Sequence, residues 1–294
     1  MTGGLPPTGT LSPASPEPGR VTGFRRLLTW RAWSPVVYGI AATVGGILFL
    51  IELGNLGVYR LSFALDQVNP LLGGFYTSLE VVAVILSLGF GLGFVVGWAR
   101  TTRFLILRGL GSVFVDFFRS MPPIALIVFA ALIGGIELKG SNLNPYQIHN
   151  ITLWLGVLVL GFHTAAYQAE IVRAGILSVP AGQTDASDAV GISRIRSMFV
   201  VVLPQAFRVS LPALGNEFSS SIKDTSLLYT IGWVEISGAA LIQTSFAYTV
   251  YLYGSLVIWF EAAFLYFVIT YLVTRSVRGI EDLFKVPGLE VAHT

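Results

Sequence analysis

Ionisable side chains interrupt the apolar stretches of this chain, most densely between residues 210 and 233. On a helix, Glu217, Ser221 and Asp224 share one face because their spacing is i, i+4, i+7, and Lys223 lies beside that face. Ionisable groups inside a membrane are costly and usually line a water-filled path or meet a partner. A zwitterionic solute that crosses lipid needs both charge signs along its route, and this face offers them. The alternative is that Lys223 and Asp224 pair with other side chains and only hold helices together.

Two further polar residues extend this predicted pathway. Glu80 lies about two turns inside an apolar stretch, where it would line the path or a gate. His163 lies in the middle of another stretch, where it would meet the solute or serve as a hydrogen-bonded packing residue. Glu170 and Arg173 are three residues apart, so we expect them to form a structural ion pair on one helix face.

A polar segment, residues 178–204, separates two of the apolar stretches. Small and polar residues predict a short helix with Asp185 in its first turn, where the helix dipole favours an anion, and with Gly191 at its end. A compact helix transmits a displacement that a flexible loop would absorb, so the segment suits contact with a partner that pushes on the membrane part. An amphipathic helix on the lipid surface is the alternative, but residues 183–191 contain no Trp, Phe or Leu for its apolar face.

Motifs for catalysis are absent from the sequence. The chain has no GxxxxGK(S/T) motif for a nucleotide phosphate, no HExxH, no GxSxG and no Cys. No group of His, Asp or Glu has the spacing of metal ligands. We therefore expect no enzyme activity of the chain itself, no cofactor, no metal ion and no nucleic-acid partner.

The composition is that of a multi-span membrane protein. Of 294 residues, 54% are hydrophobic and 12% are charged, whereas soluble domains carry about 25% charged residues. A helix of about 20 apolar residues crosses the hydrocarbon core of a bilayer. The sequence predicts an all-α integral membrane fold with six such helices, the third broken at Pro122–Pro123. They cover residues 35–53, 74–98, 110–135, 151–175, 210–233 and 249–273.

The glycines indicate how the helices pack, and the basic residues indicate how the chain is oriented in the membrane. Gly89, Gly93 and Gly97 fall four apart on one face of the second helix, which favours close helix packing. Basic residues gather before the first helix, after the second, around the polar segment and after the sixth, whereas Arg60 and Lys139 occupy the opposite loops. The positive-inside rule therefore puts both termini and the polar segment in the cytoplasm.

Several segments resemble those of one family of membrane proteins. The polar segment is similar to the coupling loop of binding-protein-dependent ABC importer permeases, whose pattern is Glu-Ala-Ala, then Gly, then Leu-Pro. Here Asp185 stands in place of the Glu and keeps its negative charge, and Ser187 stands in place of the second Ala and keeps its small size. The permeases for polar amino acids (histidine, glutamine and arginine type) are the most similar. That similarity covers Phe118 to Pro123, Ala166-Tyr167, Glu170-Ile171, Arg173-Ala174-Gly175, Gly182-Gln183, Pro204-Gln205-Ala206, Pro212, Gly215-Asn216-Glu217 and Lys223 to Leu227.

The resemblance implies a domain organisation and a set of partners. A disordered Pro/Gly-rich cytoplasmic tail (1–34) and an extra N-terminal membrane helix with a linker (35–69) would precede a five-helix permease domain (70–285) and a short cytoplasmic tail (286–294). The chain would pass a polar amino acid into the cytoplasm through a prokaryotic cell membrane. A second permease subunit, identical or paralogous, a cytoplasmic ABC ATPase dimer and an extracytoplasmic solute-binding protein would be its partners. Contact with the ATPase, which binds the ATP, would be made by Asp185, Ala186, Ser187, Ala189, Gly191, Arg194, Leu203 and Pro204.

Two other classes of protein fit parts of the sequence. A secondary transporter or channel for a small polar solute would explain the buried charges and the broken third helix. It predicts an internal repeat of hydropathy, which the sequence lacks, and it leaves the polar segment unexplained. An integral membrane enzyme needs acid/base or metal residues clustered at one membrane face, and these are missing.

Overall fold

The structure is a computed structural model in which residues 44–48, 51, 61–247 and 254–284 are described. The chain divides into two compact units, Met1–Leu53 and Gly54–Thr294. In the first unit residues 44–48 are helical, and most of the predicted first span lies outside the described residues, as do both predicted tails.

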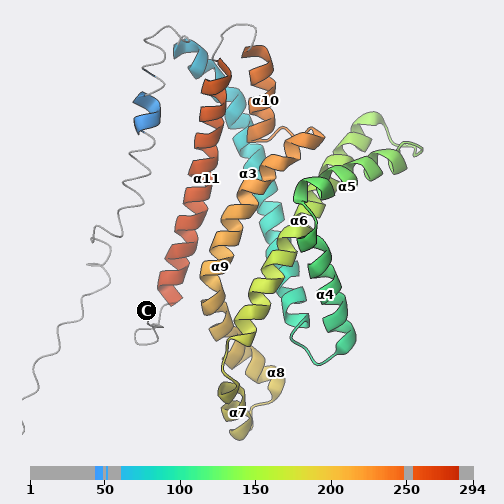
Figure 1. Cartoon of the computed structure of the whole chain (residues 1–294), viewed down its shortest axis with the longest axis vertical. Helices are drawn as coiled ribbons and strands as arrows, with labels where there is room; N and C mark the ends of the chain where they lie inside the picture. Colours follow the sequence, from blue (N-terminus) through green and yellow to red (C-terminus); the bar gives the residue numbers. More distant parts are fainter. Residues whose placement is uncertain (1–43, 49–50, 52–60, 248–253, 285–294) are drawn as a thin grey trace, which may run out of the picture. The chain divides into compact units, whose positions relative to one another are not determined.

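Every described element of the second unit is helical (Figure 1). Four continuous helical runs are long and apolar enough to cross a membrane, and the bent pair α4–α5 makes a fifth if it counts as one span. The predicted all-α membrane architecture is therefore confirmed, with four to five of the six predicted spans in the described part of the chain. The elements are α3 (Leu61–Ala99), α4 (Leu105–Ser120), α5 (Pro123–Leu138), α6 (Pro145–Leu177), α7 (Ala181–Ala189), α8 (Arg194–Ser197), the π-helix η1 (Met198–Val202), α9 (Leu203–Asp224), the 3-10 helix η2 (Thr225–Ile231), α10 (Ile236–Ala247) and α11 (Gly254–Phe284).

The third predicted span is broken at its two prolines, as expected. The axes of α4 and α5 meet at an angle of 101°. Met121 and Pro122 both have extended backbone, because the residue before a proline avoids the helical region. Pro123 then opens α5 at a position where a missing N–H leaves no hydrogen bond unmade. We call the residues 119–123 the elbow.

Other helix bounds differ from the predicted ones. The helix α3 begins at Leu61 and includes Pro70, in a stretch predicted to be a linker. The helix α6 begins before residue 151 because Asn144 and Gln147 form a capping box, each backbone N–H donating to the other's side chain at 2.9–3.0 Å. The fifth predicted span begins at Arg194 rather than near residue 210, since α8, η1 and α9 form one run. The helix α10 was not predicted.

The helices α3 and α6 make the most extensive helix–helix contact of the described elements. The predicted glycine face of α3 is at this contact: a Cβ added to Gly93 would lie 2.9 Å from the carbonyl oxygen of Ala165, and one added to Gly97 would lie 2.5 Å from that of Ala169. The glycines therefore allow the two backbones to approach more closely than any side chain would permit.

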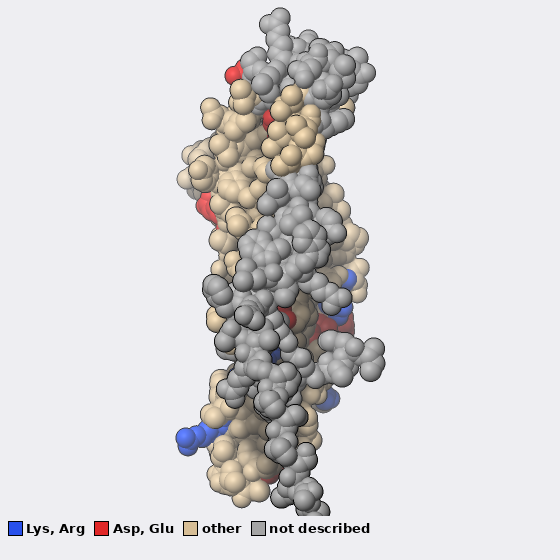
Figure 2. Space-filling model, turned by 90° about the vertical axis from the view of Figure 1, so that its left-hand side faces the viewer, with Lys and Arg blue, Asp and Glu red and all other residues tan. Residues whose placement is uncertain are grey.

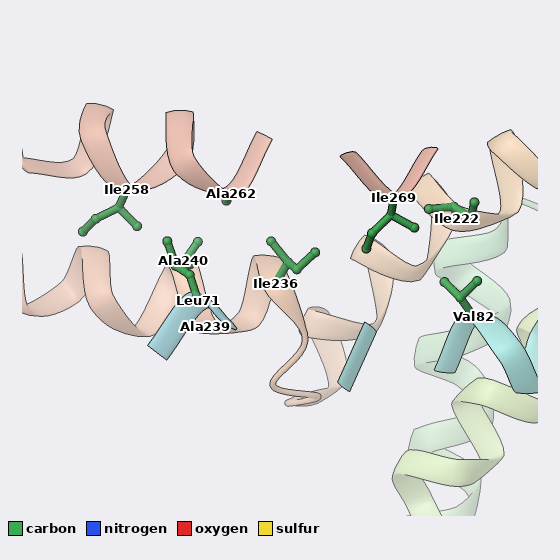
Figure 3. Packing of buried hydrophobic residues seen from close by; sticks show 9 residues of the cluster. All are labelled: Leu71, Val82, Ile222, Ile236, Ala239, Ala240, Ile258, Ala262 and Ile269. Carbon is green, nitrogen blue, oxygen red and sulfur yellow. The ribbon is translucent and has the colours of Figure 1, made fainter. Parts of the chain in front are cut away.

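A second packing region joins α3, α9, α10 and α11 (Figure 3). Its buried residues are Leu71, Val82, Ile222, Ile236, Ala239, Ala240, Ile258, Ala262 and Ile269. Figure 1 shows α10 at one end of the second unit and α7 with α8 at the other. Most of the described surface visible in Figure 2 carries no charge, which suits a lipid-facing protein.

Candidate functional site

The helix α7 is short and has a defined end. Gly191 adopts φ +78°, its N–H donates to the carbonyl of Asp188 at 3.0 Å, and the N–H of Ile192 donates to the carbonyl of Ser187 at 3.0 Å. This pair of hydrogen bonds is the Schellman motif, which needs a residue in the left-handed region and favours glycine there. The helix thus ends at Gly191 as predicted. It begins at Ala181, however, so Asp185 lies in the second turn and its predicted place in the first turn is wrong.

The side chains of α7 divide between solvent and the chain itself. Asp185, Ala186 and Ala189 are exposed. Ser187 is buried, and its hydroxyl lies 2.5 Å from the hydroxyl of the equally buried Ser197 in α8. The Ser187 side chain thus joins α7 to α8, because the two hydroxyls are hydrogen-bonded to each other away from solvent, and its contact with an ATPase stays a prediction.

The exposed end of this segment presents both charge and apolar area. Arg194 lies 3.9 Å from the carboxylate of Asp188, and both side chains are largely exposed. Val190 and Ile195 are also exposed, at 74% and 75%. Apolar side chains beside charged ones at an exposed tip suit contact with another protein.

Leu203 and Pro204 follow α8 and η1 in the same helical run. They occupy the first positions of α9 and line an apolar cavity of about 400 Å³ with side chains of α3, α6 and η1. Leu203 is half-buried and Pro204 is exposed, and their contact with the ATPase stays a prediction.

An ion network ties α3, α4 and α6 together. The carboxylate of Glu170 accepts hydrogen bonds from both Arg173 and Arg100. Arg100 also lies 3.3 Å from the hydroxyl of Ser112, to which its Nε donates. The structure thus contains the expected Glu170–Arg173 pair and adds Arg100, which the sequence could not reveal because it lies 70 residues before Glu170.

A cavity of about 380 Å³ opens beside the elbow. Its walls come from three parts of the chain: the elbow, α6 and α9. The lining residues are Arg119, Ser120, Met121, Pro122, Pro123, His163, Tyr167, Glu217, Ser220 and Asp224. One guanidinium and two carboxylates therefore face the same cavity, which we call the charged cavity.

One aromatic ring of α6, that of Tyr167, lies beside the guanidinium of Arg119. The guanidinium of Arg119 lies 5.1 Å from the centre of the Tyr167 ring, a cation–π distance. The His163 ring lies 5.0 Å from the same ring on its own helix. His163 is 6% exposed, and no hydrogen bond joins its side chain to any described residue. The cavity therefore holds a positioned cation and a buried imidazole without a polar partner.

The predicted pathway residues divide into two sets. His163, Glu217 and Asp224 line the charged cavity. Ser221 is buried between α9 and α6 and is outside the cavity lining, with its hydroxyl 3.3 Å from that of Thr164, so its place on the pathway stays a prediction.

Two other predicted residues lie outside the cavity lining. Lys223 and Glu80 are exposed and do not line the charged cavity. The neighbouring Ser220 lines it, so the cavity face of α9 consists of Glu217, Ser220 and Asp224 and keeps two of the three predicted residues.

Arg119 and Tyr167 line the charged cavity, and they were not assigned to the pathway from the sequence. Both lie in segments that resemble the permease family, but that resemblance gave them no role. For Arg119, its distance of three residues from Pro122 was the usable signal, because a proline break in a span re-aims the side chains around it. Tyr167 carries no such signal.

Glu235 is a further buried carboxylate that the sequence did not indicate. Its oxygens accept hydrogen bonds from the N–H groups of Ser237 and Gly238, at 2.9 Å each, and from the Tyr266 hydroxyl. The first N–H of α10 donates to the hydroxyl of Ser78 at 3.2 Å. Glu235 thus caps α10 and joins it to α3 and α11. It lies between the candidate spans, and burial raises the pKa of its carboxyl.

Comparison with known proteins agrees with this arrangement. Residues 89–285 match the family described as binding-protein-dependent transport system inner membrane component. The chain is 35% identical to the L-cystine transport system permease protein TcyB of Bacillus subtilis, over 71% of this chain and 84% of the relative. It is 30% identical to the glutamine transport system permease protein GlnP of Escherichia coli, over 74% and 93% respectively.

Solved structures show the same fold. An amino acid ABC transporter crystallised with histidines matches with a TM-score of 0.61 and 25% identity, over 74% of this chain and 96% of that one. The inward-facing methionine transporter MetNI matches with a TM-score of 0.60 at 21% identity, over 75% and 99%. Of the classes that the sequence left open, these matches select the importer permease over a secondary transporter or channel. The chain therefore belongs to the family of binding-protein-dependent transport inner membrane components and is a permease of the ABC importers for polar amino acids.

Proposed function

We propose that the amino acid passes through the charged cavity and that α7 is the helix through which the ATPase drives it. The observation that carries this proposal is the gathering of one guanidinium and two carboxylates from separate segments in one cavity. An α-amino acid carries a carboxylate and an ammonium group, and each forms strong hydrogen bonds with an oppositely charged side chain. The cavity offers partners for both.

Two helices link α7 to the walls of this cavity. On one side α7 follows α6, which carries His163 and Tyr167. On the other side α8, η1 and α9 form one helical run, which carries Glu217 and Asp224. A displacement of α7 is therefore delivered to two of the three cavity walls through packed helices.

The family implies partners that fit this arrangement. ATPase activity lies in a separate nucleotide-binding subunit, and an ATPase and a binding protein complete the transporter. For this chain we place α7 in the cytoplasm with both termini, and α10 on the opposite side of the inner membrane. A second permease subunit faces the first, and ATP binding by the ATPase dimer moves the two α7 helices and opens the cavity outward. Release inside requires that the inward-facing state bind the amino acid more weakly.

The coupling part of the proposal is tested on α7 itself. Ala189 and Gln183 are both exposed on this helix, but six residues put them about 120° apart around its axis. We expect Ala189→Arg to abolish amino-acid-stimulated ATP hydrolysis in liposomes that also contain the ATPase and the binding protein, because the new side chain blocks close docking. Gln183→Arg, the control, keeps the stimulation. Wild-type stimulation in both variants would show that the ATPase does not dock on this face.

A further inference from the structure

We infer that the apolar cavity beside Leu203 and Pro204 binds an acidic phospholipid, with one acyl chain in the cavity and the phosphate at Arg196. The cavity has a volume of about 400 Å³ and lies between α3, α6 and the helical run of η1 and α9. This volume is within the range of small-ligand pockets, about 300–1,000 Å³. Its aromatic and branched lining includes Phe90, Phe94, Val172, Ile176, Phe199 and Phe207.

The apolar cavity and the charged cavity lie on opposite faces of α6. His163 and Tyr167 line the charged cavity, whereas Val172 and Ile176 line the apolar one. Each residue of the second pair follows one of the first pair by nine positions, which is two and a half turns of a helix with 3.6 residues per turn. The apolar cavity is therefore outside the proposed path of the amino acid, and a lipid there is independent of that path.

The chemistry of the lining suits an acyl chain. Of the described residues that line the cavity, none is charged, and Ser210 alone carries a hydroxyl. That hydroxyl already donates to the carbonyl of Ile171 at 3.4 Å. Phe90 and Phe199 line the cavity and are 36% and 51% exposed, so the cavity opens to the surface of the spans. The medium at that surface is lipid, and an acyl chain in the cavity covers both rings.

A cation lies one helical turn from the cavity, on the side of α7. Arg196 is three residues before Phe199 in the continuous run of α8, η1 and α9, so the two side chains leave the run on about the same side. Arg196 is exposed and forms no ion pair with a described residue, whereas its neighbour Arg194 lies near Asp188. A guanidinium without a carboxylate partner suits a phosphate, because it can donate two parallel hydrogen bonds to the phosphate oxygens.

The depth of Arg196 in the membrane matches that of a lipid head group. The centre of the Phe199 ring lies 5.5 Å from that of Trp98, the second-last residue of α3. Tryptophan is enriched where the hydrocarbon meets the head groups, so Phe199 marks that boundary and Arg196 lies one turn beyond it. From Phe199 to Leu214 the lining covers about 22 Å of the run at 1.5 Å per residue, enough for the hydrocarbon of one leaflet. A lipid in this position joins α3 to the helical run that follows α7.

Photo-crosslinking tests the inference on the complete permease–ATPase complex in nanodiscs of phosphatidylcholine. The probes are phosphatidylglycerol and phosphatidylcholine that carry the same diazirine-labelled acyl chain, each added as the same small fraction of the bilayer. Mass spectrometry of the digested permease locates the adducts. We expect adducts on the lining of the apolar cavity and about fivefold more of them from phosphatidylglycerol, the ratio expected for one arginine near a negatively charged head group.

Arg196→Gln should reduce this ratio to within about twofold while both probes still label the cavity, because the acyl chain still fits. Arg278→Gln is the matched control: Arg278 is exposed on α11, which contributes no residue to the cavity lining, so the ratio should stay at its wild-type value. Equal labelling by the two probes in the wild type would show non-specific lipid only and would overturn the inference. A ratio that survives Arg196→Gln would overturn the assignment of the phosphate. Absence of adducts from the lining would show that another occupant, such as the predicted first span or a second copy of the chain, covers the cavity.

Discussion

The close contact of α3 with α6 makes Gly97 a position where one methyl group should separate two spans. Gly97→Ala places a Cβ 2.5 Å from the backbone oxygen of Ala169 and 2.9 Å from the Cβ of Val172. Ordinary van der Waals contact begins at 3.4 Å, so the nearer atom is roughly 0.9 Å too close. The carbonyl belongs to the backbone of α6 and cannot rotate away, and relief therefore requires the two helices to move apart.

The loss of stability in Gly97→Ala follows from overpacking, because one extra methyl group in a well-packed contact lowers the free energy of unfolding by about 1–3 kcal/mol. Alanine also favours the helical backbone over glycine by about 1 kcal/mol, which offsets part of that cost. Gly91 on the same helix is the matched control, because a Cβ added there meets nothing within 4 Å. The difference between Gly97→Ala and Gly91→Ala therefore isolates the steric term.

Thermal melting of the two detergent-purified variants measures this difference. We expect Gly91→Ala to melt at or above the wild-type temperature and Gly97→Ala to melt lower, by roughly 2–4 °C for each kcal/mol. Amino-acid-stimulated ATP hydrolysis should fall in Gly97→Ala as well, because α6 carries one wall of the charged cavity. Equal melting temperatures of the two variants would refute the reasoning, since they would show that α3 and α6 are not in this close contact.

Three further predictions concern other parts of the molecule. Gly191→Ala should lower the stability of α7 by about 1–2 kcal/mol and increase its amide hydrogen exchange, because φ +78° is unfavourable for alanine. Gly182→Ala, where the added Cβ meets open space and the backbone is ordinary, should slow that exchange. Equal exchange rates in the two variants would contradict this prediction. Glu170→Gln leaves Arg100 and Arg173 without a counter-charge and should lower the stability by about 1–3 kcal/mol in thermal melting, and an unchanged melting temperature would disprove the role of the network. Burial raises the pKa of Glu235, so proton binding by this carboxyl favours the folded state. The stability that it contributes is fully present below the pKa of Glu235 in the unfolded chain. That stability is lost as the pH rises through the higher pKa of Glu235 in the folded protein. Melting from about pH 5 to pH 8 should show this loss in the wild type and not in Glu235→Gln, and the same slope in both would exclude Glu235 as its source.

The sequence was sufficient for features that local chemistry determines. Apolar length set the described spans, the two prolines set the elbow, and Gly191 set the end of α7. The glycine face of α3 was also predictable, because four-residue spacing places its members on one side of a helix whatever packs there.

The remaining features depend on contacts between distant segments. Arg100 meets Glu170 only after α3 and α6 pack, and α10 is capped by Glu235 with help from Tyr266 on α11. Ser221 likewise meets Thr164 only where α9 packs against α6. Spacing along one helix cannot distinguish the face that lines a cavity from the face that packs, so it could not indicate that Ser220 rather than Ser221 lines the charged cavity. Most of the predicted first span lies outside the described residues, so that span stays a prediction.

The bent pair α4–α5 also bears on how the chain enters the membrane. Each half has 16 residues and is therefore about 24 Å long, shorter than the hydrocarbon core of about 30 Å. At the elbow, extended backbone without a helical partner is costly in lipid unless protein or water surrounds it. Both halves pack against α6, which is synthesised after them. During synthesis, the extended backbone of the elbow therefore lacks its protein neighbour until α6 has been made. Packing of α6 against α4 and α5 then completes the burial of the third span.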